Sequence, residues 1–370
     1  MDALFRQTDL SDLAAKVTAG ERLSAEEGLR LMRTPYLAAL GALANLVRER
    51  LHGDRTYYII NRHINYSNIC VNGCRFCAFS RREGEEGAYV LSVEECLAKA
   101  EAFRGGRVSE FHLVGGCHPA LRIEYYEGLL AALHNSYPDV HLQAFTAVEI
   151  AHIAQLAGLT VRACLERLRA AGLGSLPGGG AEVFSPRVRQ ELCPQKLSPD
   201  GWLEVMRTAH QLGIRSNATM LYGHIETPQE IVDHLLRLRA LQDETGGFLS
   251  FIPLAFHPAN TKLEGLPGPS AWDELRTLAV SRLLLDNVAH LKVFWIMVGL
   301  KVAQVALAFG ADDVDGTVAE EKITHAAGAQ TPEALSVEEL QRLIRDAGRT
   351  PVERDTLYRP ASLAGGRDHG

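Results

Sequence analysis

The chain has 370 residues, of which 46% are apolar and 22% are charged, and this balance excludes disordered and fibrous proteins. Lys and Arg number 38 against 45 Asp and Glu, a net charge of −7, and without a run of like charge we expect no nucleic-acid partner. The apolar run at 293–300 is far shorter than the roughly 20 residues that span a bilayer. Charged residues also interrupt the first twelve positions, so neither a membrane partner nor a secretion signal is expected, and we predict a cytoplasmic protein.

The amino-terminal segment has apolar residues at three- and four-residue spacing, which predicts a helical extension at 1–54. Within it, Ser24 and Glu27 have the spacing of a capping box, so one helix is expected to begin there.

Beyond residue 54, short β-rich runs alternate with segments of helical period, the pattern of an α/β protein with a parallel sheet. Eight strands are predicted, near 57–64, 110–114, 141–145, 173–176, 216–221, 249–254, 292–297 and 305–308. The clearest helices between them are 92–103, 123–136, 147–171, 199–212, 228–244 and 270–285. Eight such units form a closed (β/α)8 TIM-type barrel, here at 55–330, with the chemistry on the loops at the carboxyl ends of the strands. A partial six-stranded barrel is the alternative. A helical tail packed on the barrel is predicted at 331–370, with one helix at 336–347.

Seven cysteines in a long chain without an export signal argue against a disulfide framework. Three of them crowd into eight positions as C-x3-C-x2-C, directly after the first predicted strand, namely Cys70, Cys74 and Cys77. The isolated cysteines Cys96, Cys164 and Cys193 are expected to be small buried residues.

The close cysteine spacing indicates a metal centre. Gly73 lets the loop turn back, so that three sulfurs can converge. Thiolates favour zinc and iron–sulfur clusters, but structural zinc normally takes four protein ligands, and no fourth ligand stands at the customary spacing. Three ligands from one loop leave a coordination position open, which suggests chemistry rather than support for folding. Two alternatives remain: zinc completed by Cys96, Cys117 or His63, and three core cysteines without a metal.

The motif, with an aromatic residue before its last cysteine, resembles the signature of the radical S-adenosylmethionine (radical SAM) enzymes. The resemblance implies a [4Fe-4S] cluster held by the three cysteines, with its fourth iron chelated by S-adenosylmethionine (SAM). It also implies that Phe76 lies beside the adenine and that Gly115 and Gly116 receive the methionine moiety, because glycines allow the backbone to approach a ligand closely. Cys117 stands where many members carry glutamate. An ordinary turn after a strand is the alternative for the two glycines.

Further segments resemble the menaquinone (futalosine) pathway group of these enzymes, over about 20–358. The relevant segments are 63–68, 178–184, 202–210, 216–224, 251–258 and 312–317. Within the group, Gly-Gly-Gly-Ala-Glu-Val-Phe at 178–184 and Asn-Ala-Thr-Met-Leu-Tyr-Gly at 217–223 resemble aminofutalosine synthases more than cyclic dehypoxanthinylfutalosine synthases.

The resemblance to the synthases implies a transferase that consumes SAM as a co-substrate. A low-potential donor such as flavodoxin or ferredoxin reduces the cluster, and SAM is cleaved to methionine and a 5′-deoxyadenosyl radical. The radical adds to the enolpyruvyl double bond of 3-[(1-carboxyvinyl)oxy]benzoate, and loss of bicarbonate gives 6-amino-6-deoxyfutalosine. Because such a radical must meet its target before it is quenched, an enclosed site is expected.

Three charged residues near the fourth predicted strand are candidates for further SAM contacts. Glu182 follows three glycines and could accept hydrogen bonds from the ribose hydroxyls, or could be a solvated loop carboxylate. Arg187 or Arg189 could pair with the SAM carboxylate, since guanidinium offers a planar bidentate fork, although arginines are more commonly surface residues.

The implied substrate is a dicarboxylate and needs cationic groups or hydrogen-bond donors. Strand ends supply His63, Asn65, Asn217 and His257 as candidates, and His63 and Asn65 share one face of the first strand. Asp313 and Asp315 fall in a predicted loop after the last strand, where they could bind ribose, position water or cap a helix. The sister cyclase, and a zinc-stabilised barrel with a binding role, remain as alternative functions.

Overall fold

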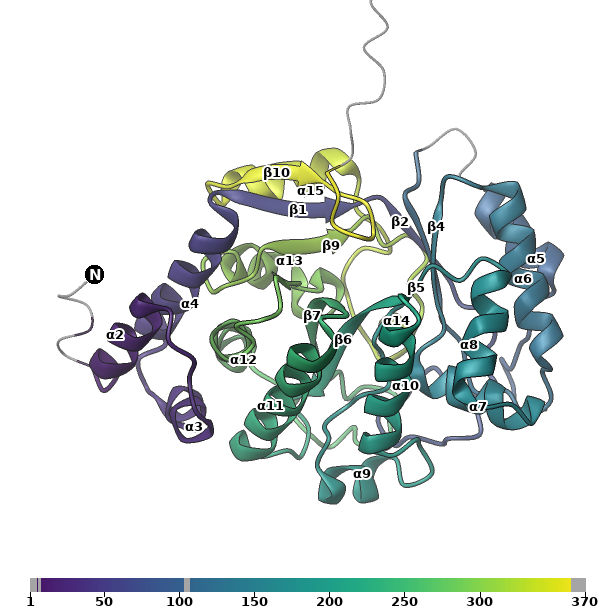
Figure 1. Ribbon diagram of the computed structural model, residues 1–370, viewed down its shortest axis with the longest axis horizontal. Helices are drawn as coiled ribbons and strands as arrows, with labels where there is room; N and C mark the ends of the chain where they lie inside the picture. Colours follow the sequence, from purple (N-terminus) through teal and green to yellow (C-terminus); the bar gives the residue numbers. More distant parts are fainter. Residues whose placement is uncertain (1–4, 6–7, 103–106, 361–370) are drawn as a thin grey trace, which may run out of the picture.

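The computed structural model describes residue 5 and residues 8–102 and 107–360 (Figure 1). Its centre is a curled parallel sheet in which each strand pairs with the next along the chain, in the order β2-β3-β4-β5-β6-β7-β8. The strands are β2 Asn61–Ile64, β3 Glu110–Leu113, β4 His141–Ala144, β5 Ser175–Leu176, β6 Arg215–Tyr222, β7 Phe248–Ala255 and β8 His290–Leu291. Their carboxyl ends meet at one edge of the sheet, where the loops gather.

The segment 313–319 connects the two outer strands of this sheet. On one side Lys292, just after β8, forms a parallel bridge with Asp313, and the Val293 amide donates to the Asp313 carbonyl over 2.8 Å. On the other side Arg62 of β2 pairs with Ala319. The barrel is therefore built from seven paired strands and a closing segment rather than from eight equivalent βα units.

A second, three-stranded parallel sheet lies beside the barrel, in the order β10-β1-β9. Its strands are β10 Thr350–Glu353, β1 Arg55–Ile59 and β9 Asp313–Gly316. The single first strand predicted at 57–64 is thus wrong, because the chain changes from this sheet to the barrel between β1 and β2. The loop predicted to hold Asp313 and Asp315 is also wrong, because both belong to β9.

Helices cover the outside of the curled sheet, and three more form the predicted amino-terminal extension, which packs against these outer helices (Figure 1). The extension consists of α2 Ser11–Ala19, α3 Ala25–Arg33 and α4 Leu37–His52. The barrel helices are α5 Val93–Glu101, α6 Ile123–Ser136, α7 Ala147–Ala157, α8 Val161–Ala170, α9 Pro186–Leu192, α10 Pro199–Gln211, α11 Pro228–Thr245, α12 Ala271–Leu284 and α13 Trp295–Ala306. Two more follow, α14 Ile323–Ala326 and α15 Val337–Asp346. The capping box of Ser24 and Glu27 is confirmed at the start of α3.

Three further predicted elements differ from the structure. The single helix predicted at 147–171 is broken between α7 and α8, because Gly158 ends α7 with φ +64° and Thr160 caps the next helix. The strand predicted at 305–308 overlaps the end of α13, and most of the strand predicted at 292–297 also differs, because α13 begins at Trp295. A short apolar run does not distinguish a strand from a buried helix by its periodicity.

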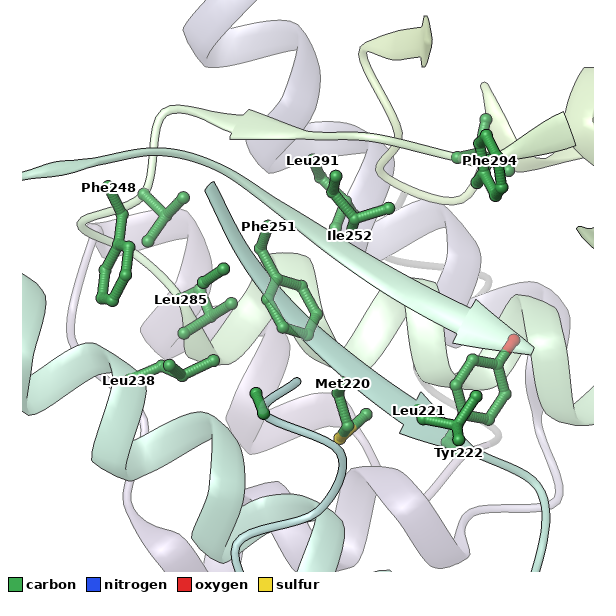
Figure 2. Packing of buried hydrophobic residues seen from close by; sticks show 14 of the residues in the cluster. Met220, Leu221, Tyr222, Leu238, Phe248, Phe251, Ile252, Leu285, Leu291 and Phe294 are labelled. Atoms are coloured by element: carbon green, nitrogen blue, oxygen red, sulfur yellow. The ribbon is translucent and has the colours of Figure 1, made fainter. Parts of the chain in front are cut away.

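The apolar core fills the space between the sheet and the helices, and Figure 2 shows part of it. Phe248 and Phe251 of β7, Leu238 of α11 and Leu285 are all buried there. Each such side chain stabilises the fold by about 1.5–3 kcal/mol. The stability of the barrel therefore resides in this layer, away from the loops at the carboxyl ends of the strands.

Among the residues that the structure describes, no single helix is both long and apolar enough to cross a membrane, and α7 with α8 reaches that length and composition only as a pair bent by 102°. The helix predicted at 336–347 is confirmed as α15, and β10 beyond it was not predicted. The division of the chain at residues 54 and 330 stays a prediction, and the last ten residues of the predicted tail lie outside the described ranges.

Candidate active site

A cavity of about 310 Å³ opens at the carboxyl ends of the barrel strands. This volume is typical of small-molecule sites. Of the fifteen predicted site residues, eleven line it: His63, Asn65, Cys70, Cys74, Phe76, Cys77, Gly115, Gly116, Glu182, His257 and Asp315. Asn217, Asp313, Arg187 and Arg189 are not among the described residues that line it.

The three clustered cysteines occupy one loop after β2, and all three reach the cavity. Gly73 turns the loop with φ +59°, as expected, and the Cys77 amide donates to the Cys74 carbonyl over 3.2 Å. The Cys70 amide donates to the Arg81 carbonyl over 3.0 Å, and the Val71 amide to the Cys117 carbonyl over 3.0 Å. These backbone bonds tie the cysteine loop to its neighbours on both sides.

Two further thiols lie against the triplet. The neighbouring Cys117 thiol lowers the pKa of Cys70 to about 5. The neighbouring Cys193 thiol, together with burial, raises the pKa of Cys74. Cys193 is buried, as predicted, but its contact with Cys74 was not foreseen. A soft donor set of three thiols at a cavity fits an iron–sulfur cluster with one open position.

The two glycines after β3 make room for the cysteine loop. A Cβ on Gly116 would lie 2.2 Å from the Ile69 carbonyl oxygen, and one on Gly115 would lie 2.6 Å from the ring of Tyr66. The Gly116 amide also donates to the Ser67 carbonyl over 2.8 Å. The space that side chains at these two positions would need is thus filled by protein, so packing alone requires glycine at both.

Glu149 is a buried carboxylate beside these glycines that sequence reasoning missed. One of its oxygens accepts from the Tyr66 hydroxyl over 2.6 Å and from the Gly115 amide over 3.0 Å. The other accepts from the amide and hydroxyl of Thr146. Burial outweighs these donors and raises the pKa of Glu149. The Thr146–Glu149 capping-box spacing at the start of α7 was the available signal.

Glu182 and Lys196 form a buried ion pair at the cysteine end of the cavity. Lys196 Nζ lies 2.5 Å from Glu182 Oε1 and 5.5 Å from the centre of the Phe76 ring. Burial opposes the charged lysine, but Glu182 and the nearby thiols raise the pKa of Lys196 well above its usual value. Glu182 has φ +51°, a left-handed conformation that is uncommon outside glycine. Lys196 was missed because nothing adjacent in the sequence marks it.

Arg187 and Arg189 do not reach this end of the cavity. Arg187 is exposed and pairs with Glu230, with its Nη2 atom 2.7 Å from Oε2. Arg189 is buried and donates to the Ala181 and Leu197 carbonyls. It therefore supports the backbone next to Glu182 and Lys196. The expectation that either arginine pairs directly with SAM is not supported by these positions.

The opposite end of the cavity is polar and deeply buried. The rings of His63 and His112 stack, with centroids 4.4 Å apart and planes 9° from parallel. Burial first, and then the neighbouring His112, lowers the pKa of His63 well below its usual value. Lys292 Nζ lies 3.0 Å from Asp315 Oδ1. Like Lys196, Lys292 was not singled out as a site residue.

The remaining candidates divide between the cavity wall and the layer behind it. His257 lines the cavity, with its Nε2 atom 2.8 Å from the Met297 carbonyl oxygen. Asn217 accepts from the Ser250 hydroxyl over 2.9 Å, behind the lining. Asp313 is paired with Arg354 and accepts from the Asp315 amide over 2.6 Å. Direct substrate contacts for Asn217 and Asp313 are therefore not supported.

Comparison with known families divides the chain into two matched regions. The model of the radical SAM superfamily matches residues 64–238, which include the cysteine loop and the glycine pair. A second model, the CofH/MqnC C-terminal region, matches residues 245–365.

Curated relatives extend over nearly the whole chain. Aminodeoxyfutalosine synthase of Thermus thermophilus is 50% identical, covering 96% of each chain. The enzyme of the same name from Streptomyces coelicolor is 46% identical, covering 94% of this chain and 92% of the relative. A 5-amino-6-(D-ribitylamino)uracil–L-tyrosine 4-hydroxyphenyl transferase of Methanothermobacter thermautotrophicus is 44% identical, covering 92% and 94%.

Among solved structures, methylornithine synthase superposes with a TM-score of 0.74 at 20% identity, covering 92% of this chain and 97% of the other. This likeness confirms the radical SAM barrel as the fold. With the matched family models and the extensive identity to the synthases, the chain belongs to the radical SAM superfamily, in the group that includes the aminodeoxyfutalosine synthases, and is a radical SAM enzyme.

Proposed function

We propose that the enzyme is an aminodeoxyfutalosine synthase of menaquinone biosynthesis. It joins the 5′-deoxyadenosyl group of SAM to 3-[(1-carboxyvinyl)oxy]benzoate and yields 6-amino-6-deoxyfutalosine, methionine and bicarbonate. The observation that carries the proposal is a single cavity lined both by the cysteine triplet and by a set of buried polar side chains. The identity of 50% and 46% to enzymes of this name supports the choice of reaction.

The cysteine end of the cavity is assigned to SAM. Cys70, Cys74 and Cys77 would hold a [4Fe-4S] cluster, which supplies the electron that cleaves SAM when both are bound. Phe76 offers an aromatic face for the adenine. The Glu182 carboxylate accepts the ribose hydroxyl hydrogens, and the backbone at 115–116 lies beside the methionine part.

We assign to Lys196 the contact with the SAM carboxylate that the sequence suggested for Arg187 or Arg189. Among the described residues that line the cavity near the cysteines, Lys196 is the cation. Its ammonium has three donors, of which one is directed at Glu182. A charge-assisted hydrogen bond to the SAM carboxylate would use one of them.

Replacing Lys196 with Met is expected to weaken SAM binding by about 10- to 100-fold, since a hydrogen bond to a charged group is worth about 1.5–3 kcal/mol. Calorimetric titration of the reconstituted enzyme with SAM measures the change. Arg187→Met is the matched control and should leave SAM affinity almost unchanged, because Arg187 is exposed and paired with Glu230. Weakened binding in Arg187→Met but not in Lys196→Met would refute the assignment.

The polar end is assigned to the substrate, with His63, Asn65, His257 and Asp315 on its wall. Asn217 and Asp313 act one layer back: Asn217 bonds to Ser250, and Asp313 holds the Asp315 amide. Depth in the barrel keeps water from the reacting atoms. We place the enzyme in the cytoplasm, with flavodoxin or ferredoxin as its reductant.

A second candidate is the joining of a tyrosine-derived group to a ribitylaminouracil, the reaction named for the relative at 44% identity. The cyclase of the futalosine pathway is the third. Mass spectrometry of reduced enzyme with SAM and each substrate in turn distinguishes them. The proposal predicts an adenosylated product with the enolpyruvyl benzoate and none with the other substrates. Free 5′-deoxyadenosine with a spirocyclic product, or coupling of tyrosine to the uracil, would replace it with the corresponding alternative.

A further inference from the structure

The polar end of the cavity contains a second buried lysine–carboxylate pair. Lys292 and Asp315 are each 6% exposed, and both line the cavity. The pair mirrors Lys196 and Glu182 at the cysteine end, and Asp315, like Glu182, lies at positive φ, here +65°. Strained carboxylates of this kind persist where the surroundings fix them, which is common at ligand sites.

The donors and acceptors around Lys292 are not all used. Among the described residues, Asp315 is the hydrogen-bond partner of its ammonium, which has three donors. His63 Nε2 and Asn65 Oδ1 are buried and have no hydrogen-bond partner among the described residues, although both side chains line the same cavity. His63 is 7% exposed and Asn65 is 5% exposed. Buried polar atoms of this kind are costly unless a ligand or water satisfies them.

Strand register places this polar set at the deep end. His63 of β2 pairs with His112 of β3, which pairs with Gln143 of β4, so the three side chains form one layer across adjacent strands. The cysteine loop begins beyond the carboxyl end of β2. Asn65 is two residues beyond His63 in the chain, a rise of about 6.6 Å, and therefore lies between this deep layer and the cysteine loop.

We propose that Lys292 binds the ring carboxylate of the substrate and thereby selects a benzoate-type anion. The inference rests on the proposed function: the enolpyruvyl carbon must face SAM at the cysteine end, so the opposite end of the same molecule, the ring carboxylate, reaches the deep layer. The free Lys292 donors and His63 Nε2 are hydrogen-bonding groups for its two oxygens. A ligand with a neutral phenol or uracil at this position would offer Lys292 no anionic partner in addition to Asp315.

The test measures binding rather than turnover, on anaerobically reconstituted enzyme by equilibrium titration. The two probes are 3-[(1-carboxyvinyl)oxy]benzoate and its analogue in which the ring carboxylate is a primary amide. Lys292→Met should weaken binding of the acid by about 10- to 100-fold, the worth of one hydrogen bond between charged groups, and should change binding of the amide little. Lys301→Met, on the exposed face of α13, is the control and should behave as the parent enzyme.

Because Lys292→Met leaves the Asp315 carboxylate buried and unpaired, the double variant Lys292→Met/Asp315→Asn provides a neutral replacement, and thermal unfolding reports whether each variant folds. Selective loss of acid binding in either folded variant supports the inference. Equal weakening of acid and amide would assign Lys292 to packing and overturn it, as would unchanged binding of the acid. If the parent enzyme binds neither probe, the proposed function fails together with the inference, whereas parent binding without a Lys292 effect removes the inference alone.

Discussion

Cys74→Ala should yield a folded protein that contains no iron–sulfur cluster and forms no product. Cys74 is one of three thiols that reach the cavity from a single loop, and two thiols do not complete the site. The loop lies at the carboxyl ends of the strands, whereas the apolar layer shown in Figure 2 stabilises the barrel. The loss of stability is therefore expected to be about 1 kcal/mol. Iron and sulfide analysis with circular dichroism measures both effects.

Cys164→Ala is the matched control for this variant. Cys164 is fully buried in α8 and does not line the cavity within the described structure, so its replacement should leave the iron content unchanged. Global unfolding of Cys74→Ala, with a folded Cys164→Ala protein, would instead indicate a structural metal such as zinc.

Gly116→Ala should have the second largest effect, through the position of the cysteine loop. The added methyl group would lie 2.2 Å from the Ile69 carbonyl oxygen and 3.1 Å from the Cys70 Cβ atom, so the loop must move. Overpacking of this kind typically costs about 1–3 kcal/mol. We expect a lower cluster content and weaker SAM binding, measured by iron analysis and by titration with SAM.

Gly128→Ala is the control, and it is expected to raise the stability of the protein rather than lower it. Gly128 is an exposed residue of α6 where an added Cβ meets nothing within 4 Å. Alanine there should stabilise the helix by about 0.5–1 kcal/mol and leave the cluster intact.

A Gly116→Ala enzyme with parental iron content and SAM affinity would contradict the tight packing between the two loops.

Local sequence signals predicted most of the barrel. Strands β3, β4, β6 and β7 and helices α6, α11 and α12 lie close to the predicted ranges, because alternating periodicities and capping residues act over a few positions. The division of the first strand into β1 and β2 was not predicted. It depends on pairing of β1 with Asp313 of β9 and Thr350 of β10, which lie more than 250 residues away in the chain.

The candidate site shows the same limit. The three cysteines form a contiguous motif, so their convergence could be predicted from spacing, whereas the place of Phe76 was implied by the resemblance to radical SAM enzymes. Lys196 and Lys292 stand alone in the sequence, and only folding brings them to Glu182 and Asp315. Arg187 shows the same limit, because its partner Glu230 is 43 positions away in the chain, and this pairing outside the cavity lining could not be predicted from the sequence.

The central claim is that the cysteine loop holds an iron–sulfur cluster with one open iron that SAM occupies. Electron paramagnetic resonance of the dithionite-reduced, anaerobically reconstituted enzyme, recorded before and after addition of SAM, tests it directly. We expect the signal of a reduced [4Fe-4S] cluster whose g-values shift when SAM binds. A colourless zinc-containing protein without such a signal, or a cluster signal that SAM leaves unchanged, would contradict the account.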